Sequence, residues 1–509
     1  MKHRRILSGL AALMLAASLP MSALAREWDI ADGDITIVAD NDGQKVSQGT
    51  ENDISDDNPI IIGNSATNTV SIVAEKDQTA SVTLSGANID GSTKGNAAVS
   101  TTGEGNVSIE LDGDNTLKSG KGHAGLEKKN GGKLTIADED KNGKLTAEGG
   151  KYGAGIGGGD QGAGSGITIT GGEIKATGGQ YGAGIGGGKG AGSDITISGG
   201  EVNATGGTSG AGIGGGYNGN GSDITITDGE VNATGGKYGA GIGGGEYGIG
   251  KDIIITGGEV NATGGRFSAG IGGGSRGTGS DITISGGEVN ASGGVNGAGI
   301  GGGLRSKGKD ITVSGDTKLK VQGGDEDHYD GAGAGIGDGG SNAYGTKILG
   351  AEVEPDTSGL TTNGSIAYYA PGADMDKDAP SQTIVGTYIP PQPAREAAAP
   401  AQPTAPLYRV TDGDGKDVSY ETTWRDGVLT VTVEADRAVL TGRLSGIASL
   451  QAQGIERIVF ITKGATSEFL TADLLAAAPA TERYALSHDG EAVTFTAGEA
   501  DVSGILVKA

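Results

Sequence analysis

The sequence predicts an all-β protein whose main part is a parallel β-helix solenoid with 29-residue coils and three strands per coil. The first observation is a glycine-rich core, "AGIG", that returns along the middle of the chain. Its isoleucine recurs at intervals of 29, 28, 29, 29, 29 and 36 residues, at Ile156, Ile185, Ile213, Ile242, Ile271, Ile300 and Ile336. A fixed period of this length is typical of solenoids and propellers, whereas collagen repeats every three residues. Weaker echoes at Leu126 and Val99 extend the array toward the N-terminus.

The second observation is an alternation of apolar residues inside each repeat. Between residues 281 and 303, three apolar pairs each flank one residue: Ile282 and Ile284, Val289 and Ala291, and Ala298 and Ile300. A period of two over short segments separated by glycine pairs predicts three half-buried strands joined by turns. Identical coils stacked at about 4.8 Å would place each residue above its counterpart in internal and external ladders.

The third observation is the placement of glycine, which accounts for 104 of the 509 residues. Pairs such as Gly286-Gly287 and Gly293-Gly294 are expected to adopt positive φ at corners. Gly297, Gly299 and Gly301 are expected to point outward from the third strand and to leave a face of bare backbone. That face is either a tight corner or a surface against which a sugar chain or another sheet lies.

The chain is expected to contain six parts. The Pro/Ala composition of residues 387–406 predicts a linker. Beyond it, two Asp-Gly pairs between alternating runs predict hairpins, and two helices are expected at Leu444–Gln453 and from Thr471 to about Ala478, which makes a small α+β domain. The expected parts are a signal peptide (1–25), irregular N-terminal coils with a cap near Trp28 (26–125), the regular repeat (126–345), an irregular β end (346–386), the linker (387–406) and the α+β domain (407–509).

The start of the chain predicts export. A basic start, an apolar run and the small residues Ala23-Leu24-Ala25 are typical of a secretory signal peptide. No later stretch predicts a membrane span, and the end "SGILVKA" shows no wall-sorting signal, so we expect a secreted or non-covalently surface-held bacterial protein. The net charge of −25 argues against nucleic acid and anionic membranes as partners, and the absence of cysteine excludes disulfides and lipid anchors.

Two polar rows follow from stacking. The second strand carries glutamate and asparagine in successive coils, at Glu201, Asn203, Glu230, Asn232, Glu259, Asn261, Glu288 and Asn290. The first strand carries aspartate, at Asp194, Asp223, Asp252, Asp281 and Asp310. Carboxylates this close repel one another by about 1 kcal/mol even at the dielectric constant of water. Either the aspartates bond their own turns and the glutamates splay into solvent, or Ca²⁺ is held between coils.

Aromatic residues are few, at 4% of the chain, yet four occupy one repeat position: Tyr152, Tyr181, Tyr238 and Phe267. Their parity matches that of the inward Ala and Ile, which favours packing at a corner, with a stacking row for a glycan as the alternative. The histidines outside the signal peptide, His123, His328 and His488, are isolated in sequence, so no catalytic residue is predicted.

One segment resembles a calcium loop. "DEDKNGKLTAEG", from Asp138, has EF-hand ligand types at its first, third and fifth positions. However, Gly149 stands where the bidentate glutamate belongs, and no helices are expected to flank it. A turn insertion at Asn142-Gly143 is the favoured interpretation.

The pattern "GSDITITDGEVNATGGKYGAGIGGG" (221–245) resembles that of exported, repeat-rich β-helix proteins of gut-type Gram-positive bacteria, which are labelled carbohydrate-binding or adhesin-like. The resemblance covers about residues 26–345. It implies a right-handed, pectin-lyase-like β-helix, with calcium and plant-polysaccharide binding as expectations, and it transfers no binding residue to a given position. Many surface adhesins have a wall anchor that is not recognised here.

The leading hypothesis is a non-enzymatic extracellular binding or adhesion protein that presents its surface ladders to a polysaccharide or a cell-surface polymer. A second hypothesis is a polysaccharide lyase or its degenerate relative; the uniformity of the middle coils disfavours it, because an active site breaks a repeat. A third is ice binding through the rows of threonine in "TIT" and "TIS". No cofactor is required by any of these hypotheses, and calcium is the one ligand ion considered.

Overall fold

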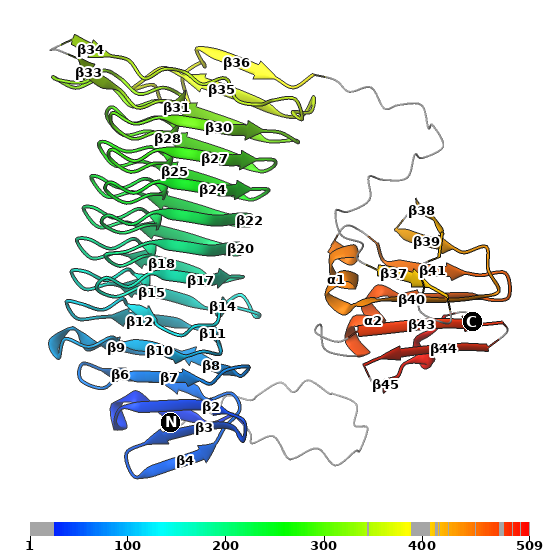
Figure 1. Ribbon diagram of the computed structural model, residues 1–509. Coiled ribbons are helices and arrows are strands. Elements are labelled where there is room, and N and C mark those ends of the chain that lie inside the picture. The colour runs from blue at the N-terminus through cyan, green and yellow to red at the C-terminus, as the bar shows by residue number, and fades with distance from the viewer. Residues whose placement is uncertain are drawn as a thin grey trace. The chain divides into compact units, whose positions relative to one another are not determined.

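The computed structural model describes residues 25–343, 346–387, 408–412, 416, 418–425, 427–452, 455–477, 483–490, 492–498 and 500–507. The chain divides into two compact units between residues 389 and 390. The first unit is a parallel β-solenoid, which confirms the predicted fold class (Figure 1). The predicted signal peptide, except Ala25, and the predicted linker, except Thr387, lie outside the described residues. The handedness of the winding stays a prediction.

Two strands of each coil belong to one large sheet. Successive coils pair in parallel and in register, as where Ile197 lies beside Ile226 and Val202 beside Val231. In two coils, the two strands run on through the corner as the single 14-residue strands β20 and β22. The sheet comprises β1 (Glu27–Asp29), β5 (Ile60–Ile62), β6 (Asn64–Ser65), β8 (Thr79–Ser85), β9 (Asn88–Asp90), β11 (Asn106–Asp112), β12 (Asp114–Lys118), β14 (Leu134–Ala137), β15 (Lys144–Glu148), β17 (Gly164–Ile169), β18 (Glu173–Thr177), β20 (Gly192–Thr205), β22 (Gly221–Thr234), β24 (Gly250–Ile255), β25 (Glu259–Thr263), β27 (Gly279–Ile284), β28 (Glu288–Ser292), β30 (Gly308–Val313), β31 (Lys318–Gln322), β35 (Ser365–Tyr369) and β36 (Gln382–Val385).

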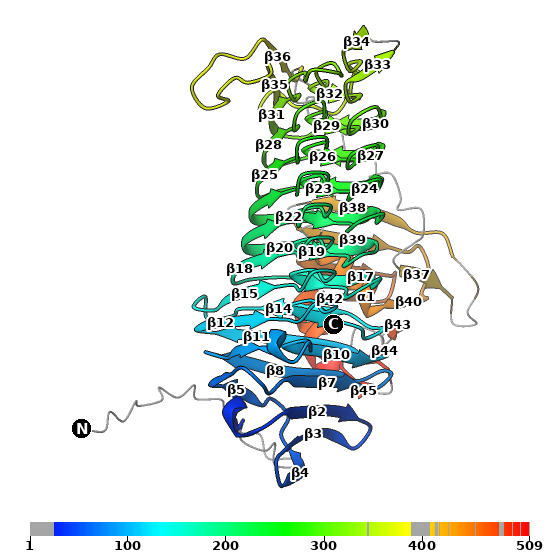
Figure 2. The ribbon, with the colours of Figure 1, turned by 90° about the vertical axis from the view of Figure 1, so that its left-hand side faces the viewer.

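The third strand of each coil is short and stacks in a second sheet, whose ladder faces the viewer in Figure 2. The predicted echoes belong to this ladder, because Val99 pairs with Leu126 and Leu126 with Ile156. The sheet comprises β2 (Ile35–Asp40), β3 (Gly43–Gln48), β4 (Glu51–Ser55), β7 (Val70–Ala74), β10 (Val99–Gly103), β13 (Leu126–Lys128), β16 (Ile156–Gly157), β19 (Ile185–Gly186), β21 (Ile213–Gly214), β23 (Ile242–Gly243), β26 (Ile271–Gly272), β29 (Ile300–Gly301) and β32 (Ile336–Gly337).

The interior of the solenoid is a column of aliphatic side chains. Each regular coil buries two aliphatic side chains from its first strand, two from its second and one from its third, as in Ile224, Ile226, Val231, Ala233 and Ile242, all at most 1% exposed. Because adjacent coils are in register, each isoleucine packs on its counterpart above and below. The hydrophobic pattern therefore fixes the register, since a slip of one residue would turn every buried side chain outward.

Both ends of the solenoid depart from the regular coil. At the N-terminal end, β2 pairs in parallel with β7 and antiparallel with β3, and β4 continues this antiparallel edge. The predicted capping residue Trp28 is 1% exposed. At the other end, β36 pairs antiparallel with β35, and the hairpin of β33 (Ser341–Ala343) and β34 (Thr346–Ile348) stands apart. Short 3₁₀ turns in this unit are Ile30–Asp32 and Gly91–Thr93.

The third-strand glycines are buried, so the predicted face of bare backbone is wrong. In one coil, a Cβ at Gly239 would lie 1.9 Å from the Gly210 carbonyl oxygen of the preceding coil. A Cβ at Gly241 would lie 2.6 Å from the carbonyl oxygen of Gly270 in the next coil. The backbone of neighbouring coils fills the space beside these glycines, which is the tight-corner interpretation.

Only part of the predicted corner role of the glycine pairs is confirmed. Gly287 has a φ of 81° and so needs the left-handed region. Gly286, Gly293 and Gly294 do not adopt a positive φ, and the prediction is wrong there. At Gly294 the constraint is contact, because a Cβ would lie 1.8 Å from the carbonyl oxygen of Gly265.

The second unit is a small α+β domain, as predicted, with two sheets and its own core around Phe460, Phe469 and Phe495. Both predicted hairpins form. One sheet contains β37 (Tyr408–Thr411), β40 (Arg437–Arg443), β43 (Arg483–Asp489), β44 (Ala492–Ala497) and β45 (Ala500–Asp501), and the other β38 (Glu421–Arg425), β39 (Val428–Thr432), β41 (Arg457–Ile461) and β42 (Thr466–Leu470). The helices are α1 (Leu444–Ala452), α2 (Thr471–Ala477) and a 3₁₀ turn at Ser503–Ile505.

Candidate ligand-binding surface

The asparagines of the second strand form a hydrogen-bonded ladder along β20, β22, β25 and β28. The side-chain amides of Asn232, Asn261 and Asn290 donate to the Oδ1 atoms of Asn203, Asn232 and Asn261 over 3.1, 2.9 and 2.7 Å. Each amide is therefore occupied by its neighbour in the stack. The asparagine row stabilises the coils and offers few free donors to a ligand.

The glutamates of the same strands are exposed and in register, from Glu201 through Glu230 and Glu259 to Glu288. The Nδ2 group of Asn203 donates to the Glu201 carboxylate over 3.1 Å. One coil earlier, Glu173 instead forms an ion pair with Lys144 at 2.6 Å. This row is a strip of negative charge flanked by the asparagine ladder.

All five aspartates of the first-strand row lie in the left-handed region, with φ between 51° and 55°. In the coil before Asp194, Gly166 takes this position with a φ of 67°. Aspartate is one of the few residues other than glycine that tolerate this conformation, so the backbone alone accounts for its recurrence. Two of the carboxylates pair with a neighbouring lysine, Lys251 with Asp252 and Lys309 with Asp310, each at 2.9 Å. Calcium at this row stays a prediction.

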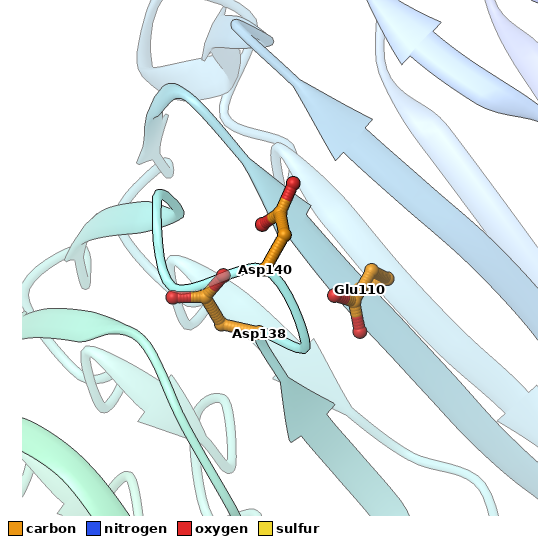
Figure 3. Close-up of side chains that lie close together, drawn as sticks. All are labelled: Glu110, Asp138 and Asp140. Carbon is orange, nitrogen blue, oxygen red and sulfur yellow. The ribbon is translucent and has the colours of Figure 1, made fainter. Parts of the chain in front are cut away.

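Another group of carboxylates forms where the segment that resembles an EF-hand loop meets β11 (Figure 3). Oxygens of Glu110, Asp138 and Asp140 lie within 4.8 Å of one another, with Glu110 on β11 and the aspartates on the loop after β14. Burial raises the pKa of the Glu110 carboxyl, and the nearby acids raise it further. Asn142 bonds both aspartates, at 3.1 and 2.9 Å, in an irregular loop without flanking helices, as the turn interpretation predicts. These three carboxylates could hold a divalent cation, and the sequence prediction missed Glu110.

The aromatic residues gather at one edge of the solenoid, where the loop after each second strand meets the loop after a third strand. Backbone bonds join these loops between coils, as from Tyr217 N–H to the Tyr181 carbonyl at 2.8 Å and from Ser275 N–H to the Tyr238 carbonyl at 2.9 Å. We call this border of the solenoid the loop edge. It brings residues about 36 positions apart in sequence into contact.

Four rings follow one another along the loop edge, and we call them the tyrosine row: Tyr152, Tyr181, Tyr217 and Tyr247. Tyr152 and Tyr181 are stacked with centroids 5.3 Å apart. Tyr181 meets Tyr217 at 5.6 Å, and Tyr217 meets Tyr247 at 6.1 Å, both edge to face. Tyr238 and Phe267 form a second stacked pair at 5.8 Å. The four repeat-position rings are half-buried and pack on one another at this corner of the coil, outside the aliphatic column, which agrees with packing at a corner. A stacking row for a glycan stays a prediction.

Tyr217 and Tyr247 were not predicted. They lie in the loop after the third strand, at successive positions of adjacent coils, and thus outside the repeat position of Tyr152 and Tyr181. The available signal was a large ring in a turn whose equivalent residues in other coils are mostly polar, such as Asp160, Lys189 and Ser275.

Basic side chains accompany the rings. Lys121 and Lys151 lie 5.6 and 5.3 Å from the centroid of Tyr152, and Lys151 also lies 5.8 Å from that of Tyr181. The remaining contacts are Lys189 with Tyr217 at 5.8 Å, Lys237 with Tyr238 at 4.8 Å, Arg266 with Phe267 at 5.0 Å and Arg276 with Tyr247 at 5.9 Å. A cation within about 6 Å of a ring centroid is attracted to the ring face.

The histidines outside the predicted signal peptide have different surroundings. His123 contacts the buried Glu127 through Nδ1 at 2.9 Å, and His328 packs edge to face on Tyr329. His488, in the C-terminal unit, is 1% exposed, with Thr462 and Ser467 hydroxyls 3.0 and 2.8 Å from its ring nitrogens. Its burial keeps it from any ligand at the surface.

His488 predicts a pH dependence of the C-terminal unit. Burial lowers the pKa of His488 from an ordinary value of 6.5 to about 4, so the folded unit binds fewer protons than the unfolded chain between these pH values. Its unfolding temperature should therefore be highest above pH 6.5 and fall as the pH is lowered toward 4. Scanning calorimetry of the full chain at pH 7, 5.5 and 4 measures this shift. In His488→Gln, the unfolding temperature should depend much less on pH. If its pH dependence is unchanged, other groups cause the dependence.

The beta helix repeat family model matches residues 141–160, 167–189, 195–217, 224–246, 253–275 and 282–304. These six segments of the regular coils are similar to the repeats of that family, and we refer to them as the beta helix repeats. The repeats contain Tyr152, Tyr181 and Tyr217, whereas Tyr247 and Arg276 lie in the short loops between them. No curated protein and no solved structure matches the chain.

The beta helix repeats thus place the predicted glutamate and asparagine rows together and keep the predicted aspartates and aromatic residues on other parts of the coil. The glutamate and asparagine rows share one face, and the aspartate row follows the first strands. The predicted aromatics form two stacked pairs at the loop edge. In the described part of the chain no helix is long and apolar enough to cross a membrane.

Proposed function

We propose that the protein is a non-enzymatic extracellular binding protein that holds a polysaccharide along the loop edge of its beta helix repeats. The observation that carries the proposal is the tyrosine row, in which four rings from consecutive coils lie 5.3 to 6.1 Å apart. Tyr247, at the end of the row, is 46% exposed, so its ring is open to a ligand.

The spacing of the row supports a polymeric ligand. Coils follow one another at about 4.8 Å, which is close to the length of one sugar ring, so equivalent contacts recur along a glycan chain. The row is also rigid, because the loops that carry the rings bond to each other through their backbones. A preformed row loses little conformational entropy when it binds, which favours affinity from several weak contacts.

Removal of two rings tests the proposal. In Tyr217→Ala/Tyr247→Ala, each lost aromatic contact is worth about 0.5–1.5 kcal/mol, so we expect an affinity for the bound glycan that is weaker by about tenfold. The matched control is Ile254→Ala/Trp424→Ala, which removes two exposed apolar side chains outside the loop edge, one on β24 and one in the C-terminal unit, and should bind as the wild type does. Titration of the variants against the glycan provides the measurement.

A glycan array identifies the ligand beforehand and is run with and without a chelator. Binding that disappears with the chelator would place calcium, at the aspartate row or at Glu110, Asp138 and Asp140, in the interaction. If no glycan is retained under either condition, the proposal is wrong.

A further inference from the structure

We propose that the loop edge selects anionic glycans, that is, polysaccharides with carboxylate or sulfate groups. This inference rests on the proposed function and adds the chemical class of its ligand. The observation behind it is the set of six cations that accompany the rings, which we call the basic row: Lys121, Lys151, Lys189, Lys237, Arg266 and Arg276.

The basic row is unusual because of the charge of the chain around it. The protein has 63 acidic against 38 basic residues, for a net charge of −25. Elsewhere on the repeats, several exposed lysines pair with carboxylates, as Lys144 does with Glu173, Lys251 with Asp252 and Lys309 with Asp310, whereas Lys175 and Lys318 pair with none in the described part of the chain. Among the described residues, no member of the basic row forms an ion pair. Six cations without an ion pair thus lie along one edge.

The acids at the same edge compensate this row only in part. They include Asp160, Glu246 and Asp327, and Glu246 accepts a hydrogen bond from Ser209 Oγ at 2.7 Å. Burial raises the pKa of the Asp327 carboxyl, but backbone hydrogen bonds and the charge of Arg266 hold it below its usual value, so Arg266 is the member of the row that meets an acid. Contact with an aromatic face positions a cation without removing its charge. The basic row is therefore available to a polymer that carries negative charge.

The spacing of the basic row fits a glycan that carries one negative charge on each of several successive sugars. The cations recur from coil to coil beside the rings, so a glycan along the edge would meet a ring and a cation at each of several neighbouring units. Lysine ammonium and arginine guanidinium groups bind carboxylate and sulfate by charge-assisted hydrogen bonds. A neutral glycan would gain the ring contacts alone.

Single-stranded nucleic acid, which also binds to aromatic and basic residues, fits less well. Bases bind such surfaces by stacking on exposed ring faces. Here Tyr152 and Tyr181 stack on each other at 5.3 Å with planes 12° apart, so no base fits between them, whereas a sugar chain can follow the row at the coil spacing of about 4.8 Å without entering between the rings. The glycan is therefore favoured, and an oligonucleotide is an arm of the test.

The test compares charged and neutral forms of the same backbone: polygalacturonate with its methyl ester, and dextran sulfate with dextran, at low and at high salt. We expect the wild type to prefer the charged member of the pair it binds, with an affinity that falls as salt screens the contact. The variant Lys151→Gln/Lys189→Gln/Arg276→Gln should bind that glycan about tenfold more weakly, on the order of 0.2–1 kcal/mol for each exposed pair. Its binding should also depend less on salt.

The control variant is Lys144→Gln/Lys175→Gln/Lys251→Gln, which removes the same charge from strand positions away from the loop edge. It should bind as the wild type does, and circular dichroism should show both variants folded. Equal binding of charged and neutral forms, or equal loss in both variants, would overturn the selectivity and leave the proposed function standing. If the protein binds none of these glycans and none on the array, both the selectivity and the proposed function are wrong. If it binds a dT oligonucleotide and no glycan, the loop edge is a nucleic-acid site.

Discussion

Gly239→Ala is expected to destabilise the solenoid by about 3 kcal/mol, although it adds a single methyl group. The new Cβ would lie 1.9 Å from the carbonyl oxygen of Gly210, 2.3 Å from its carbon and 2.7 Å from the nitrogen of Ala211. All three atoms are backbone of the preceding coil, which cannot move aside without breaking the bonds between coils, such as that from Gly236 N–H to the Gly210 carbonyl at 3.0 Å. Urea unfolding followed by circular dichroism measures the loss.

The control for this substitution is Gly122→Ala, in the same kind of loop. There the nearest atom to a new Cβ is the Asp160 Cβ at 3.8 Å, an ordinary contact, so stability should change by less than about 0.5 kcal/mol. Neither glycine has a positive φ, so the pair separates crowding from conformational strain. If the two variants unfold at similar urea concentrations, neighbouring coils can move apart to admit a side chain.

This crowding explains why the glycines were misread from the sequence. Alternation correctly places Gly239 and Gly241 opposite the inward-facing residues, and from the period alone such a position is expected to face solvent. Whether it does depends on the path of the loops, since a Cβ at Gly241 would also lie 2.7 Å from the Thr263 nitrogen. Burial of the outward positions is a property of the stacked coils, and one coil read by itself does not reveal it.

The parts that were predicted correctly depend on side chains in regular strands. The isoleucine ladder from Val99 through Leu126 to Ile156 follows from period and alternation, because in-register stacking transfers each position to the next coil. The hairpins of the C-terminal unit follow from local turn chemistry, as at Gly490 with its φ of 67°.

The candidate site was predicted less completely, because it lies in loops. The pair Tyr152 and Tyr181 shares a repeat position and was found, whereas the continuation to Tyr217 requires a loop of the next coil to cross toward Tyr181. The positive φ of the aspartate row was also invisible, so a backbone requirement at Asp223 was read as a surface charge with a calcium alternative. Contacts between loops of different coils carry no periodic signal of their own.

The second large effect is expected at the N-terminal end of the solenoid, where Trp28→Ala should destabilise the N-terminal coils by about 3–5 kcal/mol. Trp28 is among the largest fully buried side chains, and its indole N–H donates to Oδ2 of the buried Asp56 at 2.9 Å. Its loss therefore leaves a cavity and also deprives a buried carboxylate of a donor. Because each coil contacts only its neighbours, the effect should be local. Hydrogen exchange should accelerate in β5 and β8 and stay unchanged in β27.

Trp28→Phe and Trp424→Ala separate the contributions to this effect. Trp28→Phe keeps most of the buried area and loses the N–H, so it should cost about 1–3 kcal/mol, the range for an unsatisfied buried polar group. Trp424 is 39% exposed in the C-terminal unit, and its removal should leave exchange in the solenoid as it is in the wild type. If Trp28→Ala instead accelerates exchange equally in β5 and β27, the coils unfold as one cooperative block and the end residue stabilises the whole column. If exchange in β5 does not change, the antiparallel strands β3 and β4 close the end without the indole, and the capping role of Trp28 is wrong.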